Sequence, residues 1–198
     1  LESSGNSFPD QARLLDLGCG PGNISSRLAQ RWPHCSVLGL DAADRMIAVA
    51  DERRLAAGIS RERLRYDKAF LPLSQAGKPA DLIVSNSLLH HLHDPHQLWL
   101  SLIPLASAHC LVLHRDLRRP DSEACIDQLC DCHVADAPAV LQRDYRASLH
   151  ASFTLEEVKA QLKDAGLGGL QVFAVEDRYL EVSGWITGCQ AGSVQSRP

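Results

Sequence analysis

The amino-acid sequence predicts an α/β fold with a doubly wound, mostly parallel sheet of seven strands and helices on both faces. Short apolar runs alternate with helical patterns along most of the 198 residues, which is typical of strands and crossover helices. A glycine-rich turn follows the first apolar run, where such folds often approach a ligand. Two apolar runs near the end of the chain are separated by a tight turn and predict a terminal antiparallel hairpin.

The first part of the chain predicts five strands and three helices. Each strand is a short apolar run, and each helix shows helical apolar spacing, a capping residue or a stop signal. The expected strands are residues 12–18, 36–41, 63–67, 81–86 and 110–116. The expected helices are residues 23–32, 44–57 and 95–106, the last of them capped by Asp94. Strands in this arrangement end at one edge of the sheet, where ligands bind.

The regular alternation ends after the fifth strand. Residues 121–149 are polar and mixed, and they predict two short helices separated at Pro138. We expect this segment to be a helical insert that caps the substrate site. A chain of this length forms one domain, which is expected to cover residues 1–187. Residues 188–198 are rich in Gly, Ser and Gln and are expected to form a flexible tail.

The end of the domain combines a helix with the hairpin. Thr154 and Glu157 have the spacing of a capping box, which predicts a helix over residues 154–165. Residues 170–175 and 178–185 form the predicted hairpin. We expect the hairpin to add one antiparallel strand at an edge of the sheet.

Composition excludes several classes of protein. Lys and Arg number 20 and Asp and Glu number 24, which gives a net charge of −4 and argues against a dedicated nucleic-acid binder. No apolar run approaches the roughly 20 residues of a membrane-spanning helix. The chain has 7 cysteines, an odd number, and no recognisable signal peptide. These features predict reduced thiols and a cytoplasmic location.

The strongest functional signal lies between the first two strands. Gly18, Gly20 and Gly22 permit a turn in which the backbone approaches a ligand closely. Asp41 ends the second strand, 21 positions after Gly20, where a carboxylate can accept hydrogen bonds from both ribose hydroxyls of an adenosine. The pair predicts either a nicotinamide or flavin dinucleotide or S-adenosylmethionine.

Three residues favour the second of these cofactors. Asn23 occupies the position of the third glycine in the dinucleotide pattern, which weakens the case for a pyrophosphate at the helix N-terminus. Asp16 precedes the loop and suits an ammonium group better than a phosphate, which it would repel. Asp67 follows the third strand and can accept a hydrogen bond from an adenine amine.

These segments resemble the class I S-adenosylmethionine-dependent methyltransferases. Residues 14–22, LLDLGCGPG, resemble the first motif of that family, and residues 38–41 resemble the second. Residues 67–73 resemble the acidic, proline-containing segment after the third strand, and residues 81–92 the fourth-strand motif of the small-molecule branch. The resemblance implies a Rossmann-like fold, S-adenosylmethionine as the cofactor, and direct methyl transfer to a small-molecule acceptor.

The resemblance also implies roles for individual residues. The loop and the acid before it would hold the methionine part of the cofactor, the end of the second strand the ribose, and the next segments the adenine and the sulfonium. These cofactor-binding residues are Asp16, Gly18, Cys19, Gly20 and Gly22 for methionine; Asp41 and Ala42 for ribose; Met46, Asp67 and Ala69 for adenine; and Asn86 and Ser87 beside the sulfonium and the substrate entrance.

Candidate catalytic residues come from three places in the sequence. His90 and His91 belong to a histidine-rich run, and either can serve as a base if the acceptor needs one, although the family motif also places them there as scaffold. Asp116 ends the fifth strand, where side chains are expected to point into the substrate pocket. We expect Asp116 and Arg115 either to bind a charged substrate or to pair with each other. Tyr145 comes from the insert. No metal is expected, although the cysteines of the insert leave metalloid methylation open.

The motif after the fourth strand narrows the range of chemical groups that can accept the methyl group. Ser85-Asn86-Ser87-Leu88 stands where methyltransferases acting on amides or base amines carry an Asn or Asp, two prolines and an aromatic residue. Methyl transfer to such amines is therefore not expected. Alternatives left open are a noncatalytic S-adenosylmethionine-binding partner subunit, an RNA methyltransferase and a nicotinamide-dependent oxidoreductase. The acceptor itself and the oligomeric state do not follow from the sequence.

Overall fold

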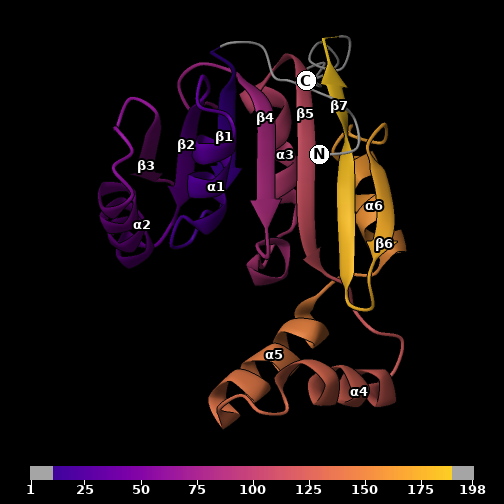
Figure 1. Cartoon of the computed structure of the whole chain (residues 1–198). Helices are drawn as coiled ribbons and strands as arrows, with labels where there is room; N and C mark the ends of the chain where they lie inside the picture. The colour runs from indigo at the N-terminus through magenta and orange to yellow at the C-terminus, as the bar shows by residue number, and fades with distance from the viewer. Residues whose placement is uncertain (1–10, 189–198) are drawn as a thin grey trace.

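The computed structural model describes residues 11–188, which form one seven-stranded sheet flanked by helices (Figure 1). The strand order is β3-β2-β1-β4-β5-β7-β6. The strands are β1 (Arg13–Leu17), β2 (Ser36–Asp41), β3 (Leu64–Lys68), β4 (Ala80–Asn86), β5 (Ala106–Leu117), β6 (Gln171–Val175) and β7 (Tyr179–Thr187). The order reverses between β1 and β4, which is where open parallel sheets bind ligands.

The directions of the strands confirm the predicted fold class. Neighbours from β3 to β5 run parallel, whereas β7 runs antiparallel to both β5 and β6. The expected position of the antiparallel strand was wrong, because β7 lies between β5 and β6 and not at the edge. Burial explains this order. In β7, Leu180, Val182 and Ile186 are at most 1% exposed, whereas no residue of β6 is fully buried, as suits an edge strand.

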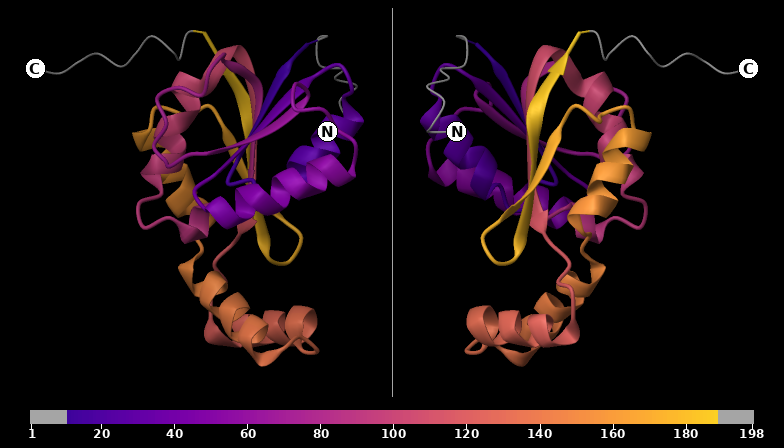
Figure 2. Two further views of the ribbon diagram at one scale, coloured as in Figure 1. Left: turned by 90° about the vertical axis from the view of Figure 1, so that its left-hand side faces the viewer. Right: turned by 90° about the vertical axis from the view of Figure 1, so that its right-hand side faces the viewer.

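Helices cover both faces of the sheet, as Figure 2 shows in two edge-on views. The helices α1 (Asn23–Arg31) and α2 (Asp44–Ala56) pack on one face through Leu28, Ala29 and Ala50. The helices α3 (His96–Leu105) and α6 (Leu155–Asp164) pack on the other face through a larger cluster. That cluster includes Trp99, Leu102, Val158 and Leu162. The sheet is therefore buried on both sides, which explains the apolar runs of its central strands.

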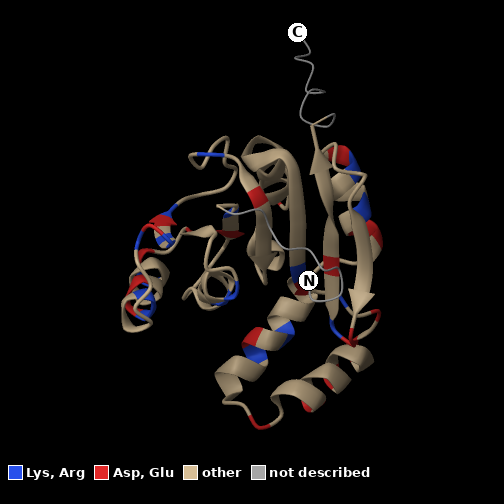
Figure 3. Cartoon of the chain, turned by 45° about the horizontal axis from the view of Figure 1, so that its top comes forward, with Lys and Arg blue, Asp and Glu red and all other residues tan. Residues whose placement is uncertain are grey.

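The predicted insert is a helical hairpin that projects beyond the carboxyl ends of β4 and β5 (Figure 1). It consists of α4 (Glu123–Val134) and α5 (Ala139–Ala151), which are separated at Pro138 as predicted. A small separate core of Leu117, Ile126, Leu129 and Leu149 holds it to the end of β5. The charged residues of α4 are all acidic, whereas α5 carries both signs (Figure 3), and Arg146 pairs with Glu123 and Asp127.

Most element boundaries agree with the sequence predictions to within a residue or two. The capping box of α6 is confirmed: Thr154 Oγ1 accepts from the Glu157 N–H at 3.3 Å, and Glu157 accepts from the Thr154 N–H at 2.8 Å. Pro95 rather than Asp94 caps α3, although Asp94 accepts from the His96 N–H at 3.0 Å. The short 3-10 helix η2 (Leu89–His91) was not predicted.

Two further predictions are a tail over residues 188–198 and a chain without a membrane-spanning segment. Apart from Gly188, the expected tail lies outside the described residues. Within residues 11–188, no helix combines the length and apolar character needed to cross a bilayer.

Candidate active site

The three glycines of the loop after β1 all have positive φ, but each is required for a different reason. Their φ angles are 68° at Gly18, 52° at Gly20 and 80° at Gly22. A Cβ at Gly18 would lie 2.7 Å from a Leu88 methyl group, and one at Gly22 would lie 2.4 Å from the Tyr66 hydroxyl. A Cβ at Gly20 would meet no atom within 4 Å. Gly20 is therefore the glycine that faces open space at the ligand-binding edge.

The carboxylate of Asp41 joins the glycine loop to the start of α2. Oδ2 accepts a hydrogen bond from the Gly20 N–H at 2.9 Å, and Oδ1 accepts one from the Ala43 N–H at 2.9 Å. Each oxygen of an ionised carboxylate can accept two hydrogen bonds, so each retains capacity for another donor. Asp41 is thus fixed in position with a free acceptor site on each oxygen.

Asp16 lies beneath the loop and is almost completely buried, with 1% of its surface exposed. Ser25 Oγ donates a hydrogen bond to its Oδ2. Burial raises the pKa of Asp16 to about 7, which the bond from Ser25 only partly opposes. Near neutral pH this carboxyl group is therefore poised between its neutral and charged forms.

The side chain of Cys19 points away from the ligand edge. It is 7% exposed and packs in the core between the sheet and α1 and α2. Burial raises the pKa of its thiol, so the group stays protonated. Any contact of Cys19 with a cofactor must therefore come from its backbone.

A cavity of about 200 Å³ opens beyond Asp41. Its walls are formed by the ends of β1 and β2, the segment after β3, and the segment around η2. The lining includes Asp41, Ala42, Ala69, Phe70, Leu88 and Leu92. Most of these side chains are apolar, and Phe70 is 65% exposed although it is aromatic. The cavity has the character of a site for a flat, largely apolar ring.

Two residues expected at the adenine do not line this cavity. Asp67 lies within β3, and its carboxylate forms an ion pair with Arg65 at 2.7 Å. Met46 lies in the first turn of α2 and is half-buried. The sequence prediction instead missed Phe70, Leu88 and Leu92, although all three belong to the quoted motif segments.

At the end of β4, the backbone is held in an uncommon conformation. Ser87 has a φ of 53°, and its N–H donates to the Arg115 carbonyl at 2.9 Å. The Asn86 side-chain amide donates to Ser87 Oγ at 3.0 Å. A non-glycine residue in the left-handed region costs about 1–3 kcal/mol and is concentrated at functional sites. Both exposed side chains lie where β4 meets the glycine loop.

Asp116 is buried beneath η2 and does not face the open pocket, contrary to the expectation from its strand position. It is 1% exposed, and its carboxylate accepts from the Leu89 and Leu117 N–H groups, both at 2.7 Å. It also bonds to Nδ1 of His90. Burial raises the pKa of Asp116, but the bond from His90 and the nearby His114 outweigh it and hold the pKa below its usual range. Asp116 can act on a substrate only through His90.

Arg115 and Asp116 do not pair with each other. Arg115 instead pairs with Glu181 on β7, with Nη2 and Oε2 2.9 Å apart. Successive side chains of a strand point to opposite faces, which separates Arg115 from its neighbour. The Arg115 side chain stays 40% exposed, beside Asn86 on β4.

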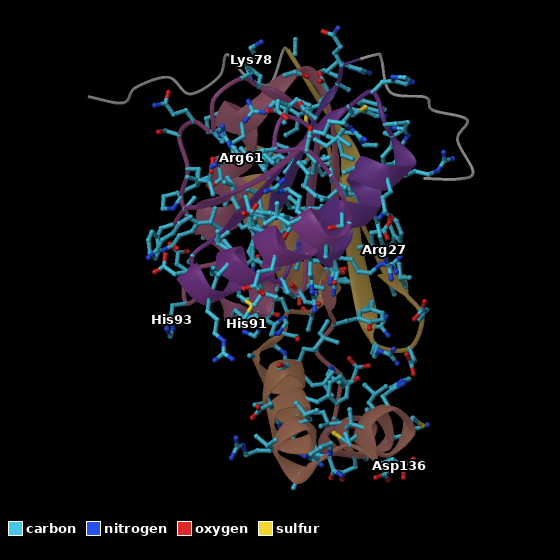
Figure 4. All side chains as sticks on the ribbon, turned by 60° about the vertical axis from the view of Figure 1, so that its left-hand side comes forward. Arg27, Arg61, Lys78, His91, His93 and Asp136 are labelled. Atoms are coloured by element: carbon cyan, nitrogen blue, oxygen red, sulfur yellow. The ribbon has the colours of Figure 1, made fainter. Side chains whose placement is uncertain are left out.

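His91 differs from His90 in exposure and partners. The His90 side chain is 5% exposed, whereas His91 is exposed, and no hydrogen bond or ion pair among the described residues uses the His91 ring. The two ring centroids lie 4.0 Å apart. Burial and the neighbouring His90 lower the pKa of His91, so its ring is neutral near pH 7. Figure 4 shows His91 and His93 at the end of the sheet nearer the α4–α5 hairpin.

Tyr145 is part of the core of the hairpin and does not face the pocket, which corrects the expectation for it. It packs with Leu129 and Leu149, and its hydroxyl is buried without a hydrogen-bond partner. Burial raises the pKa of Tyr145 to about 12. The sequence spacing could not show that this face of α5 turns inward toward Tyr179. Within residues 11–188, no three His, Cys, Asp or Glu side chains gather in a metal-binding arrangement.

Comparison with known proteins agrees with this geometry. Residues 14–102, from β1 into α3, match the family model described as "Methyltransferase domain". A trans-aconitate 2-methyltransferase from Variovorax paradoxus is 41% identical over 91 residues, which cover 46% of this chain and 33% of the relative. A malonyl-[acyl-carrier protein] O-methyltransferase from Paenibacillus is 32% identical over 100 residues, or 49% of this chain and 36% of that one. The aligned part thus spans about a third of these relatives.

Solved structures share the fold over nearly all of the chain. A methyltransferase from Aquifex aeolicus described as SAM dependent has a TM-score of 0.64 at 18% identity, covering 91% of this chain and 86% of that one. The plantazolicin methyltransferase BpumL, solved with SAH, has a TM-score of 0.69 at 16% identity, covering 89% and 76%.

The sheet order, the glycine loop and the fixed acid after β2 define an α/β domain whose ligand-binding edge has the form of an adenosine-cofactor site. Over residues 14–102 the chain is similar to the methyltransferase family whose motifs it carries, and the solved structures share its fold.

Proposed function

We propose that this chain is an enzyme that transfers the methyl group of S-adenosylmethionine to a small-molecule acceptor by direct displacement. The observation that carries the proposal is the placement of Asp41. Its carboxylate is fixed by the Gly20 and Ala43 N–H groups beside a glycine with open space and a cavity of about 200 Å³. This arrangement suits an adenosine with two ribose hydroxyls.

The residues at this edge fit the parts of the cofactor. Asp41 would accept from the ribose hydroxyls, with Ala42 beside them. Ala69 and Phe70 would flank the adenine, with Met46 and Asp67 acting from outside the cavity. Asp16 would attract the ammonium group of the cofactor. The methionine part would contact the backbone of the loop residues Gly18, Cys19, Gly20 and Gly22. Asn86 and Ser87 would border the sulfonium. The cofactor supplies the electrophilic methyl carbon, and the chain supplies alignment.

We propose His91 as the group that contacts the acceptor and His90 with Asp116 as its support. The His91 ring is exposed and its lowered pKa keeps it neutral and able to accept a proton. Asp116 holds His90 through Nδ1 and holds η2 through the Leu89 N–H. These bonds fix the backbone that carries His91. Tyr145 would act only by supporting the hairpin.

The relatives and Arg115 support a proposal for the class of acceptor. The named acceptors of the two relatives above, trans-aconitate and malonyl-[acyl-carrier protein], guide the choice of compounds to test. Arg115 is 40% exposed beside Asn86, where it could meet a carboxylate. We therefore propose an acidic metabolite as the acceptor. We also propose a cytoplasmic location, where exposed thiols such as those of Cys125 and Cys132 would stay reduced.

Calorimetric titration with S-adenosylmethionine and S-adenosylhomocysteine tests the cofactor site. We expect micromolar binding of both compounds, no binding of NAD(H), and loss of binding in Asp41→Ala. Glu52→Ala removes an exposed carboxylate from α2 and serves as the matched control. NAD(H) binding, or full affinity in Asp41→Ala, would contradict the proposal.

Turnover separates the enzyme from a noncatalytic partner subunit and from an RNA methyltransferase. Formation of S-adenosylhomocysteine should depend on a carboxylate-bearing acceptor and not on added RNA. His91→Ala should lower turnover without changing cofactor affinity. Cofactor binding without acceptor-dependent turnover over a broad panel would instead favour the noncatalytic alternative.

A further inference from the structure

A second cavity lies at the opposite end of the sheet from the cofactor site. It has a volume of about 320 Å³ and is formed by the starts of β1, β2 and β3 and the loop before β4. We call it the arginine pocket. Its lining residues are Arg13, Ser36, Val37, Leu38, Arg61, Glu62, Arg65, Gly77 and Lys78. In Figure 4, Arg61 and Lys78 lie toward one end of the molecule and His91 and His93 toward the hairpin.

The charge of the arginine pocket is opposite to that of the whole chain. Arg13, Arg61, Arg65 and Lys78 line it together with a single carboxylate, that of Glu62, whereas the chain has a net charge of −4. The Glu62 carboxylate is engaged locally, because hydrogen bonds to its own backbone and to Ser60 hold its pKa below the usual range. The pocket therefore presents a concentrated positive potential on an acidic protein.

Arg13 and Arg65 line the pocket from the strands on either side of β2, and their positive charges repel each other. Arg13 is half-buried, and its guanidinium donates to the Ala76 carbonyl. Burial and the charge of Arg65 both lower the pKa of Arg13, which Asp81 only partly opposes. Arg65 pairs with Asp67 at 2.7 Å but remains half-exposed. An anion between the two guanidinium groups would relieve their repulsion.

The outer cations have unused donors. Among residues 11–188, neither the Arg61 nor the Lys78 side chain takes part in a hydrogen bond or an ion pair. The nearby carboxylate of Asp51 feels the charge of Arg61 but bonds to Arg54 at 2.7 Å. Arginine presents a planar fork of donors that matches phosphate oxygens, and lysine adds a mobile charge.

We propose that the arginine pocket binds a small phosphate-bearing anion with two or more charges. A concave pocket of about 320 Å³ suits a compact anion better than an extended nucleic-acid backbone, which needs a continuous basic surface. Ser36 begins β2 at this pocket and Asp41 ends β2 at the cofactor site. At about 3.3 Å per residue, the two sites are too far apart to compete.

Titration with inorganic pyrophosphate at constant ionic strength tests the proposal. We expect saturable binding by calorimetry, equal in the presence and absence of S-adenosylhomocysteine. Arg61→Gln and Lys78→Gln should each weaken binding by about threefold, and the double variant by about tenfold, as expected for exposed charge pairs that act independently. Arg27→Gln is the matched control, because Arg27 is also an exposed cation without an ion pair in the described part of the chain (Figure 4).

The other outcomes overturn the proposal. Absence of saturable binding, or an equal loss in Arg27→Gln, would show only diffuse attraction of anions. Binding of a single-stranded RNA decamer that pyrophosphate does not displace would assign the surface to nucleic acid. Unchanged affinity for S-adenosylhomocysteine and an unchanged melting temperature in each variant show that the variants are folded, and they keep this test independent of the proposed methyl transfer.

Discussion

At the scale of single residues, Asp16 couples stability to pH. Its folded-state pKa is about 7, above the ordinary value of 3.8, so the folded chain holds a proton that the unfolded chain releases. This contribution is complete below about pH 4 and is lost as the pH rises through 7. Wild type should therefore lose up to about 4 kcal/mol of unfolding free energy over this range relative to Asp16→Asn. Urea unfolding at several pH values measures it, and parallel curves for the two proteins would contradict it.

The same carboxyl group predicts a proton released on cofactor binding. An ammonium group near Asp16 favours the charged carboxylate, so binding should expel the proton that Asp16 holds near neutral pH. The affinity for S-adenosylhomocysteine should accordingly rise as the pH increases from 6 to 8. Calorimetry in two buffers of different ionisation enthalpy counts the proton. Asp16→Asn should bind more weakly and release none.

Gly20 and Gly22 predict different consequences for the same substitution. Both have positive φ, so alanine at either position costs about 1 kcal/mol in backbone strain. At Gly22 the new Cβ also meets the Tyr66 hydroxyl at 2.4 Å, so Gly22→Ala should be the less stable protein. At Gly20 the new Cβ meets only the space for the cofactor, so Gly20→Ala should fold but lose at least tenfold in S-adenosylhomocysteine affinity. Equal melting temperatures for the two variants would contradict this difference.

Positions that depend on the backbone follow from the sequence, whereas the direction of a side chain does not. Gly20 and Asp41 follow from motif spacing, because the spacing fixes which strand ends they occupy. Tyr145 and Asp116 were placed at the pocket by position along the chain, but α5 and β5 turn them inward. Asp67 is predicted to lie beside adenine, and the sequence did not show that its carboxylate pairs with Arg65.

At the scale of elements, the capping box of α6 predicts a measurable loss of stability. Thr154→Ala removes the hydroxyl that accepts from the Glu157 N–H and should lower the unfolding free energy by about 1 kcal/mol. Thr187→Ala, at the exposed end of β7, is the matched control and should stay within about 0.5 kcal/mol of wild type. A loss no greater than the control's would show that the cap contributes nothing.

Elements with local signals were predicted closely, whereas their arrangement was predicted only in class. The end of α1 and the start of α6 follow from Pro33 and the capping box, which act within one turn of helix. The position of β7 between β5 and β6 depends on which long apolar face can be buried, a property of the assembled sheet. The η2 turn depends on Asp116, whose carboxylate accepts a hydrogen bond from the Leu89 N–H, 27 residues earlier in the chain.

At the scale of the whole molecule, the α4–α5 hairpin is a unit with its own small core, attached at the end of β5. The hairpin leaves and rejoins the domain at one point, where the Arg119 N–H donates to the Phe153 carbonyl at 3.1 Å. Its core of Ile126, Leu129 and Leu149 contains no residue of the glycine loop or of the cavity beyond Asp41. The hairpin can therefore be replaced as a unit.

Replacing residues 121–151 by a short Gly/Ser linker should separate cofactor binding from turnover. Because the cofactor site is built by β1, β2, β4 and their loops, the shortened chain should keep its affinity for S-adenosylhomocysteine within a few-fold. Because the hairpin projects over the carboxyl ends of β4 and β5 beside η2, the chain should lose acceptor-dependent turnover. Removal also uncovers Leu117 and Tyr179, so Leu117→Thr with Tyr179→Thr in the shortened chain limits aggregation. Full turnover without the hairpin would show that the acceptor binds elsewhere, and loss of cofactor affinity in a folded product would show that the hairpin helps to form the cofactor site.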